Sequence, residues 1–132
     1  MVIGIDVGRT HLDLAATAAA PTLPRRVAND AAGIATLEAA LMPLAPTLIV
    51  LEATGSSHQP LLAALRLAAL PVRVINPTQS VAFRTQQVGR HKTDRADAKL
   101  LARFGAVHHA ALRRATPQEP DLARLRQLVG YR

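Results

Sequence analysis

Met1-Val2-Ile3-Gly4-Ile5-Asp6-Val7-Gly8 opens the chain with an apolar run that carries one acidic residue near its end. The run is rich in β-branched residues and short, so it predicts a strand over residues 1–7 that ends in a turn. Residues 11–17 alternate apolar and polar side chains and predict a second strand, antiparallel to the first. No basic segment precedes the apolar run, so the N-terminus does not resemble a signal peptide.

The segments that follow alternate between helix and strand patterns. Residues 47–51 are fully apolar, which is typical of a buried parallel strand. The expected order gives an α/β fold with a mixed five-stranded sheet flanked by helices. The remaining elements are expected as an edge strand at 25–28, a helix capped by Asn29-Asp30 and ended by 43–46, a helix at 59–70, a strand at 71–75, helices at 80–88 and from 93 to about 109, a linker at 117–120, and a last helix carrying Leu122, Leu125 and Val129.

The composition is that of a folded domain. Hydrophobic residues make up 49% of the 132 residues, and no apolar run is long enough to cross a bilayer, so no membrane association is expected. The chain has no cysteine, which excludes a disulfide framework and fits a cytoplasmic location. Two Phe and one Tyr are too few for a base-stacking module, so any nucleic acid is expected to be held by its backbone.

The positive charge is concentrated in the C-terminal part of the chain. Residues 1–83 hold five Arg and five acidic residues, whereas residues 84–132 hold eleven Lys and Arg against four acidic residues. The whole net charge of +7 therefore lies in the second stretch. Such an excess favours a polyanionic partner, because binding to phosphates releases counterions. The alternative is a solvated helical face in an Arg-rich protein.

Two acidic residues follow apolar strands. Asp6 ends the first strand, and Glu52 ends the parallel strand that we expect beside it. Both carboxylates should then emerge at one edge of the sheet, where ligands of open α/β sheets bind. Each also has a structural interpretation, since Asp6 could form the turn before Gly8 and Glu52 could cap backbone N–H groups.

Asp94 and Asp97 are expected in the first turn of the helix that begins at Thr93. A spacing of three places both side chains on one face. Acids in a first turn also offset the helix dipole without any further role. Four carboxylates gathered in one place would repel one another, and Mg²⁺ or Mn²⁺ would relieve that repulsion. Nearby cations are expected to bind the nucleic-acid backbone: Arg90, Lys92, Arg95, Lys99 and Arg103.

Five motifs carry a family resemblance. They are Gly4-Ile5-Asp6-Val7-Gly8, Leu12-Asp13-Leu14, Glu52-Ala53-Thr54-Gly55, Val74-Ile75-Asn76-Pro77 and Lys92-Thr93-Asp94-Arg95-Ala96-Asp97-Ala98. In this order they resemble the N-terminal domain of the DEDD insertion-sequence transposases, the recombinases that use a bridge RNA. The resemblance extends from the first strand to Leu128, and the third and fifth motifs are its most specific part.

The resemblance implies an RNase H-like fold of the RuvC type and a catalytic, metal-binding tetrad. Matched residue by residue, the tetrad falls on Asp6, Glu52, Asp94 and Asp97. It further implies Mg²⁺ (or Mn²⁺), DNA cleavage and strand transfer, a guide RNA and a homo-oligomer. Residues 1–112 would form the catalytic domain, and residues 113–132 would be a linker and the start of a helix leading to a missing C-terminal domain. The isolated domain is not expected to complete recombination.

Two positions depart from the family pattern. Gly8-Arg9 stands where members commonly have Ser-Lys, and Ser56-Ser57 stands where many have an aromatic residue. The tetrad is not affected, so the departures bear on local contacts with nucleic acid.

Two other functions fit parts of the sequence. One is a non-catalytic module for nucleic-acid binding and oligomerisation, which the basic C-terminal stretch would serve. The other is a fragment of an ATP-binding domain of the actin, Hsp70 and sugar-kinase type, because Asp6-x-Gly8-x-Thr10 resembles its first phosphate loop. That fold needs a second lobe and a second Asp-x-Gly motif, which this chain lacks.

Overall fold

A mixed five-stranded sheet forms the centre of the computed structural model, which describes residues 1–53, 55–88 and 97–114. The strand order is β3-β2-β1-β4-β5, with β1 paired antiparallel to β2 and parallel to β4. This is the α/β sheet expected from the sequence, and it is consistent with the RNase H-like class. The strands are β1 (Val2–Val7), β2 (His11–Ala16), β3 (Arg26–Ala28), β4 (Leu48–Glu52) and β5 (Val72–Ile75).

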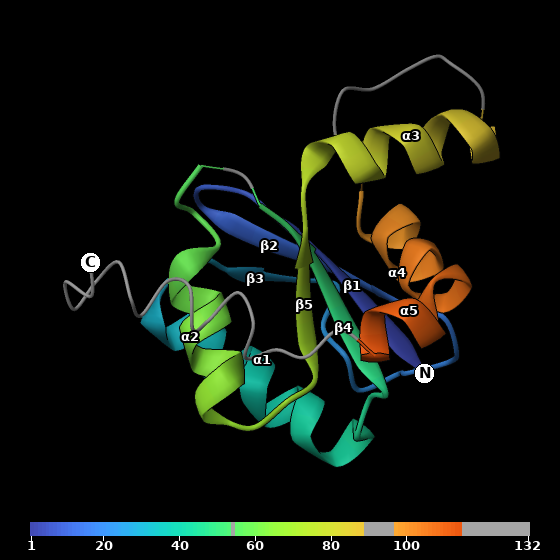
Figure 1. Ribbon diagram of the computed structural model, residues 1–132. Coiled ribbons are helices and arrows are strands. Elements are labelled where there is room, and N and C mark those ends of the chain that lie inside the picture. The colour runs from blue at the N-terminus through green and yellow to red at the C-terminus, as the bar shows by residue number, and fades with distance from the viewer. Residues whose placement is uncertain (54, 89–96, 115–132) are drawn as a thin grey trace, which may run out of the picture.

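Helices cover both faces of the sheet (Figure 1). On one face, α1 (Ala31–Leu44) and α2 (Gln59–Leu67) close a core that includes Ile3, Ile5, Ile49 and Leu51. On the other face, α3 (Pro77–Val88), α4 (Ala98–Val107) and α5 (His109–Arg114) close a smaller core. The alternation of side chains along a strand therefore divides each central strand between two apolar layers.

The closest packing in the second layer is between α4 and β1. A Cβ on Gly4 would clash with the carbonyl oxygen of Ala98 and the backbone nitrogen of Ala102. Further along the helix, a Cβ on Gly105 would lie 2.7 Å from side-chain carbons of Val2 and Val50. The two glycines allow the helix backbone to rest on the sheet. The contacts also give the direction of α4, which begins near Gly4 and runs toward Val2, antiparallel to β1.

One helix ends as expected and another does not. As expected, α1 ends within residues 43–46: it continues to Leu44 and stops where Ala45 takes a left-handed φ of 46°. The helix α2 ends at Leu67 rather than at residue 70, because Ala69 has a φ of 60° and Leu70 N–H donates to the carbonyl of Leu65 at 3.0 Å. Both ends use alanine where glycine is the usual residue, and for α2 the sequence carries no other stop signal at residue 67.

Two helix starts also differ. The helix α3 begins at Pro77 rather than at residue 80, because Asn76 and Gln79 cap each other's backbone N–H groups at 2.9 and 3.1 Å. The helix α4 begins at Ala98, and Asp97 is its N-cap with an extended backbone. The expectation that this helix begins at Thr93, with Asp97 inside its first turn, is wrong. Residues 89–96 lie outside the described part of the chain.

No helix within the described residues combines the length and apolarity needed to cross a membrane.

The packing of α4 on β1 predicts a large cost for Gly4→Ala. The added methyl meets helix backbone, which cannot rotate away, so we expect a loss of about 3 kcal/mol in the free energy of unfolding by urea. Gly55→Ala is the matched control, since its Cβ meets nothing within 4 Å and only its φ of 56° is unfavourable. That control should lose about 1 kcal/mol. Equal losses in the two variants would contradict the close approach of α4.

Candidate active site

Asp6 and Glu52 lie on the same face of the sheet and at the same level. The parallel register pairs Ile5 with Leu51, so the next residue of each strand is Asp6 on β1 and Glu52 on β4. Neighbouring strands are about 4.8 Å apart. Two residues earlier, Gly4 and Val50 face the α4 side, so alternation directs the two carboxylates to that side as well. The structure thus brings together the first two residues of the expected tetrad.

The carboxylate of Glu52 is buried. Only 4% of the residue is exposed, and its Oε2 accepts a hydrogen bond from the Oγ of Ser80, a residue that is 1% exposed. Residues in the described part of the chain form no ion pair with Glu52. Removing an ionised carboxylate from water is costly unless a hydrogen-bond donor or a cation compensates. Asp6, by comparison, is half-buried and has further interactions.

Asp97 stands at the end of α4 that lies nearest to these carboxylates. Its Oδ1 accepts the N–H of Leu100 at 2.8 Å, the bond expected of an N-cap. Ala98, the next residue, is in contact range of Gly4, which precedes Asp6 by about 7 Å along the strand. The helix therefore begins at the carboxyl ends of β1 and β4, and its dipole favours negative charge there.

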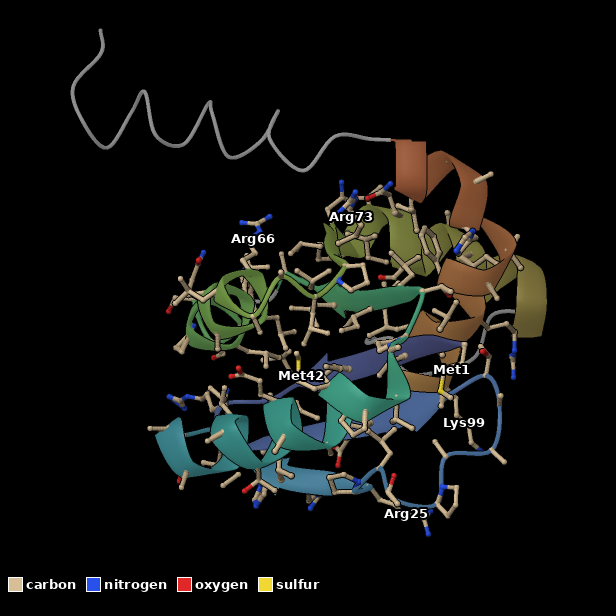
Figure 2. The ribbon with its side chains drawn as sticks, turned by 90° about the horizontal axis from the view of Figure 1, so that it is seen from below. Met1, Arg25, Met42, Arg66, Arg73 and Lys99 are labelled. Atoms are coloured by element: carbon tan, nitrogen blue, oxygen red, sulfur yellow. The ribbon has the colours of Figure 1, made fainter. Side chains whose placement is uncertain are left out.

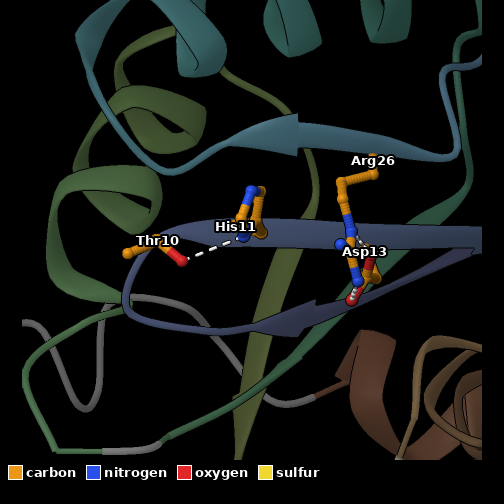
Figure 3. Close-up of polar contacts among 4 residues, drawn as sticks. All are labelled: Thr10, His11, Asp13 and Arg26. Carbon is orange, nitrogen blue, oxygen red and sulfur yellow. Dashed lines mark hydrogen bonds and ion pairs between the residues drawn. The ribbon is translucent and has the colours of Figure 1, made fainter.

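A fourth carboxylate lies opposite Asp6 on the neighbouring strand. The antiparallel register pairs Asp6 with Asp13, and Asp13 is held by Arg26, whose Nε and Nη2 donate at 2.6 and 3.3 Å (Figure 3). The hydrogen bond and charge of Asp13 raise the pKa of the Arg26 guanidinium, and the charge of Asp6 adds to this effect. Asp13 already has its counter-ion, although the side chains of Arg26 and Asp13 are 60% and 39% exposed.

A side chain that the sequence marks only as a helix cap connects the loops behind the two strands. The Nδ2 of Asn29 donates to the carbonyl of Gly8 at 2.8 Å and to that of Ser57 at 3.1 Å. Gly8 follows β1 and Ser57 follows β4. Asn29 therefore holds together the two loops that leave the carboxylates, while the adjacent Asp30 caps α1. In the first of these loops, Thr10 Oγ1 and His11 Nδ1 lie 2.9 Å apart (Figure 3).

Several of the expected site residues cannot be placed. Asp94, Arg90, Lys92 and Arg95 lie outside the described residues. Within residues 1–53, 55–88 and 97–114, no three His, Cys, Asp or Glu side chains are close enough to hold a metal ion. Asp6, Glu52 and Asp97 thus share one region without forming a metal-binding cluster by themselves.

Two of the residues expected to contact nucleic acid, Lys99 and Arg103, lie in the part of the chain that the structure describes. Lys99 and Arg103 are exposed on α4, and their spacing of four places them on one face of the helix. Figure 2 shows Lys99 on a different part of the surface from Arg66 of α2 and Arg73 of β5. Lys99 and Arg103 belong to the C-terminal stretch that holds the net positive charge, whereas Arg26, beside Asp13, does not.

Sequence analysis alone missed Ser80 and the bridging role of Asn29. The pattern Asn76-x-x-Gln79 is a capping signal that would have moved the start of α3 to Pro77 and placed Ser80 in its first turn. No comparable signal exists for Asn29, because its partners are main-chain carbonyls of distant loops.

Comparison with known proteins gives one family. A family model for transposases of the DEDD type, named for IS110, matches residues 3–132. The comparison with curated proteins gives no match. The match covers nearly the whole chain and supports the transposase interpretation over the ATP-binding one.

The capping bond of Asp97 predicts a difference between two substitutions. Asp97→Ala removes the acceptor and should lower the free energy of unfolding by about 1 kcal/mol in the presence of EDTA. Asp97→Asn keeps an acceptor of similar capping strength and should stay within about 0.5 kcal/mol of the wild type. Urea denaturation measures both. If the Asn variant loses as much as the Ala variant, the bond to Leu100 does not stabilise α4.

Proposed function

Because the chain belongs to the DEDD transposase family, we propose that it is a metal-dependent catalytic domain that cleaves and transfers DNA strands. The observation that carries the proposal is the placement of Asp6 and Glu52 on one face of adjacent strands, at the end of the sheet where α4 begins with Asp97. The family tetrad would be completed by Asp94.

The donor set fits a hard divalent cation. Carboxylate oxygens are preferred ligands of Mg²⁺ and Mn²⁺, and Glu52 is buried with a hydroxyl as its described partner. Asp6, Glu52, Asp94 and Asp97 would hold the ion or ions, which when bound activate the attacking oxygen and stabilise the leaving oxygen of a phosphodiester. The chain's own groups position this chemistry: α4 directs its positive end toward the site, and Asn29 fixes the loops behind it.

The basic residues suit a DNA substrate. Lys99 and Arg103 on α4, with Arg90, Lys92 and Arg95 before it, would contact phosphates beside the carboxylates. The family also suggests a guide RNA, a homo-oligomer and a second domain reached through residues 113–132, with residues 1–112 as the catalytic unit. These features are part of the proposal and rest on the family alone.

Mn²⁺ should stabilise the folded chain, because an ion that binds only the native state raises its free energy of unfolding. At 100 times the dissociation constant the gain is about 2.7 kcal/mol, or roughly 10 °C in melting temperature. Asp6→Asn, Asp94→Asn and Asp97→Asn should each abolish the rise, as measured by a thermal shift titration. Asp13→Asn is the matched control: Asp13 lies opposite Asp6 but is already paired with Arg26, so this variant should respond like the wild type.

A normal response of Asp94→Asn and Asp97→Asn would refute the site assignment. Metal-dependent nicking of a supercoiled plasmid, lost in Asp6→Asn, would distinguish an enzyme from a module that only binds nucleic acid.

Binding of double-stranded DNA should weaken steeply with salt. Each phosphate contact contributes about −0.9 to the slope of log K against log salt. Lys99→Ala and Arg103→Ala should each reduce the slope by about 1, measured by fluorescence anisotropy between 50 and 200 mM salt. Arg66→Ala on α2 is the control and should leave the slope unchanged, because α2 covers the opposite face of the sheet (Figure 1). A slope near zero in the wild type would exclude backbone binding.

A further inference from the structure

A buried hydroxyl contacts the buried carboxylate of the candidate site. Ser80 Oγ lies within hydrogen-bond distance of Glu52 Oε2, and the two residues are 1% and 4% exposed. The contact joins the first turn of α3 to the end of β4, and the two residues are 28 positions apart in the sequence. Neither the family motifs nor the tetrad includes Ser80.

The local structure fixes the position of Ser80. Asn76 and Gln79 cap each other's backbone, and the N–H of Ser80 donates to the carbonyl of Asn76 at 3.3 Å. The Oγ of Ser80 also lies 3.0 Å from the carbonyl oxygen of Pro77. A hydroxyl has one proton to donate, and a carboxylate is the stronger of the two acceptors. Ser80 therefore donates to Glu52 when that carboxylate is ionised.

We propose that Ser80 is a positioning residue that makes Glu52 a single-oxygen ligand and so favours Mn²⁺ and Mg²⁺ over Ca²⁺. The inference rests on the proposed function, because it requires Glu52 to bind the cation. With Oε2 engaged by the hydroxyl and the side chain held in place, Oε1 is the oxygen that Glu52 offers to a metal.

Single-oxygen binding distinguishes the cations by size and coordination number. Mg²⁺ demands near-ideal octahedral geometry with ligands at about 2.1 Å. It keeps several water ligands and is bound by only one or two carboxylates. Ca²⁺ accepts six to eight ligands and often binds both oxygens of one carboxylate. A hydroxyl bound to Oε2 occupies one lone pair of that oxygen and holds the carboxylate in one orientation, so it disfavours binding of the larger ion through both oxygens. Loss of the hydroxyl would free Glu52 to rotate and bind with both oxygens.

The test compares Mn²⁺ and Ca²⁺ on the 132-residue chain. Mn²⁺ binding is followed by the loss of the free-ion electron paramagnetic resonance signal, and Ca²⁺ is titrated as a competitor. Ser80→Ala should raise the affinity for Ca²⁺ relative to Mn²⁺ about tenfold, in the range typical of changes to groups that orient metal ligands. Ser80→Thr keeps a hydroxyl and should restore the ratio found in the wild type.

Thr36→Ala serves as the matched control. It also removes a helix hydroxyl, one that donates to the carbonyl of Ala32 at 3.1 Å on α1 across the sheet, and it should leave the ratio unchanged. Melting temperatures measured in EDTA verify that every variant is folded before metal is added.

The outcomes separate the two proposals. If Ser80→Ala weakens both ions by the same factor, or changes neither, the selectivity role is wrong while the metal site stands. If Ser80→Thr fails to restore the ratio although it is folded, the hydroxyl is not the cause. If the wild type binds no Mn²⁺, or Glu52→Gln binds it as well as the wild type, then Glu52 holds no metal, and both the site and the role of Ser80 are overturned.

Discussion

The backbone contact between Gly4 of β1 and the first turns of α4 determines where α4 and its N-cap lie relative to the ends of β1 and β4. A side chain larger than hydrogen at position 4 would meet the backbone at Ala98 and Ala102, so the helix can rest on the sheet only because glycine is there. The contact places the start of α4, and with it Asp97, over the strand ends that carry Asp6 and Glu52. The contact thus brings Asp97 into the same region as Asp6 and Glu52, although these residues are far apart in the sequence.

Each acidic residue in this region has a different electrostatic environment, although the register places three of them side by side. Asp13 is balanced by an exposed arginine on the edge strand, and Glu52 is buried against a hydroxyl that carries no charge. One carboxylate oxygen of Asp97 accepts a hydrogen bond from a backbone N–H in the first turn of α4. Arg26 therefore removes Asp13 from competition for a cation, whereas a hydroxyl or a helix N–H stabilises a carboxylate without neutralising it. Among the described carboxylates of this region, Asp13 is thus neutralised by a cation, whereas Glu52 and Asp97 are stabilised by neutral donors.

The sequence predicts the sheet well and the helix boundaries less well, for physical reasons that differ from one element to the next. Apolar runs and alternation are sufficient for the five strands and for β1 lying beside β4, because each strand must bury specific faces. The end of α1 was predicted from its prolines, whereas that of α2 was missed because Ala69 adopts a conformation for which glycine is the usual signal. The start of α4 was misplaced because Thr93 and Asp97 are both good caps, and only tertiary packing selects between them.

Some residues of the candidate site can be predicted from the sequence, and others can be found only from their contacts in the structure. Asp6 and Glu52 could be paired from sequence because the edge of a parallel sheet collects the residues that follow its strands. Ser80 and Asn29 could not, because their function depends on atoms far away in sequence: a carboxylate oxygen in one case and two main-chain carbonyls in the other. Chemistry-bearing residues can thus be found from patterns, whereas the groups that orient them are found from contacts. A site assignment made from motifs alone will therefore name the acidic residues and omit the groups that hold those residues in place.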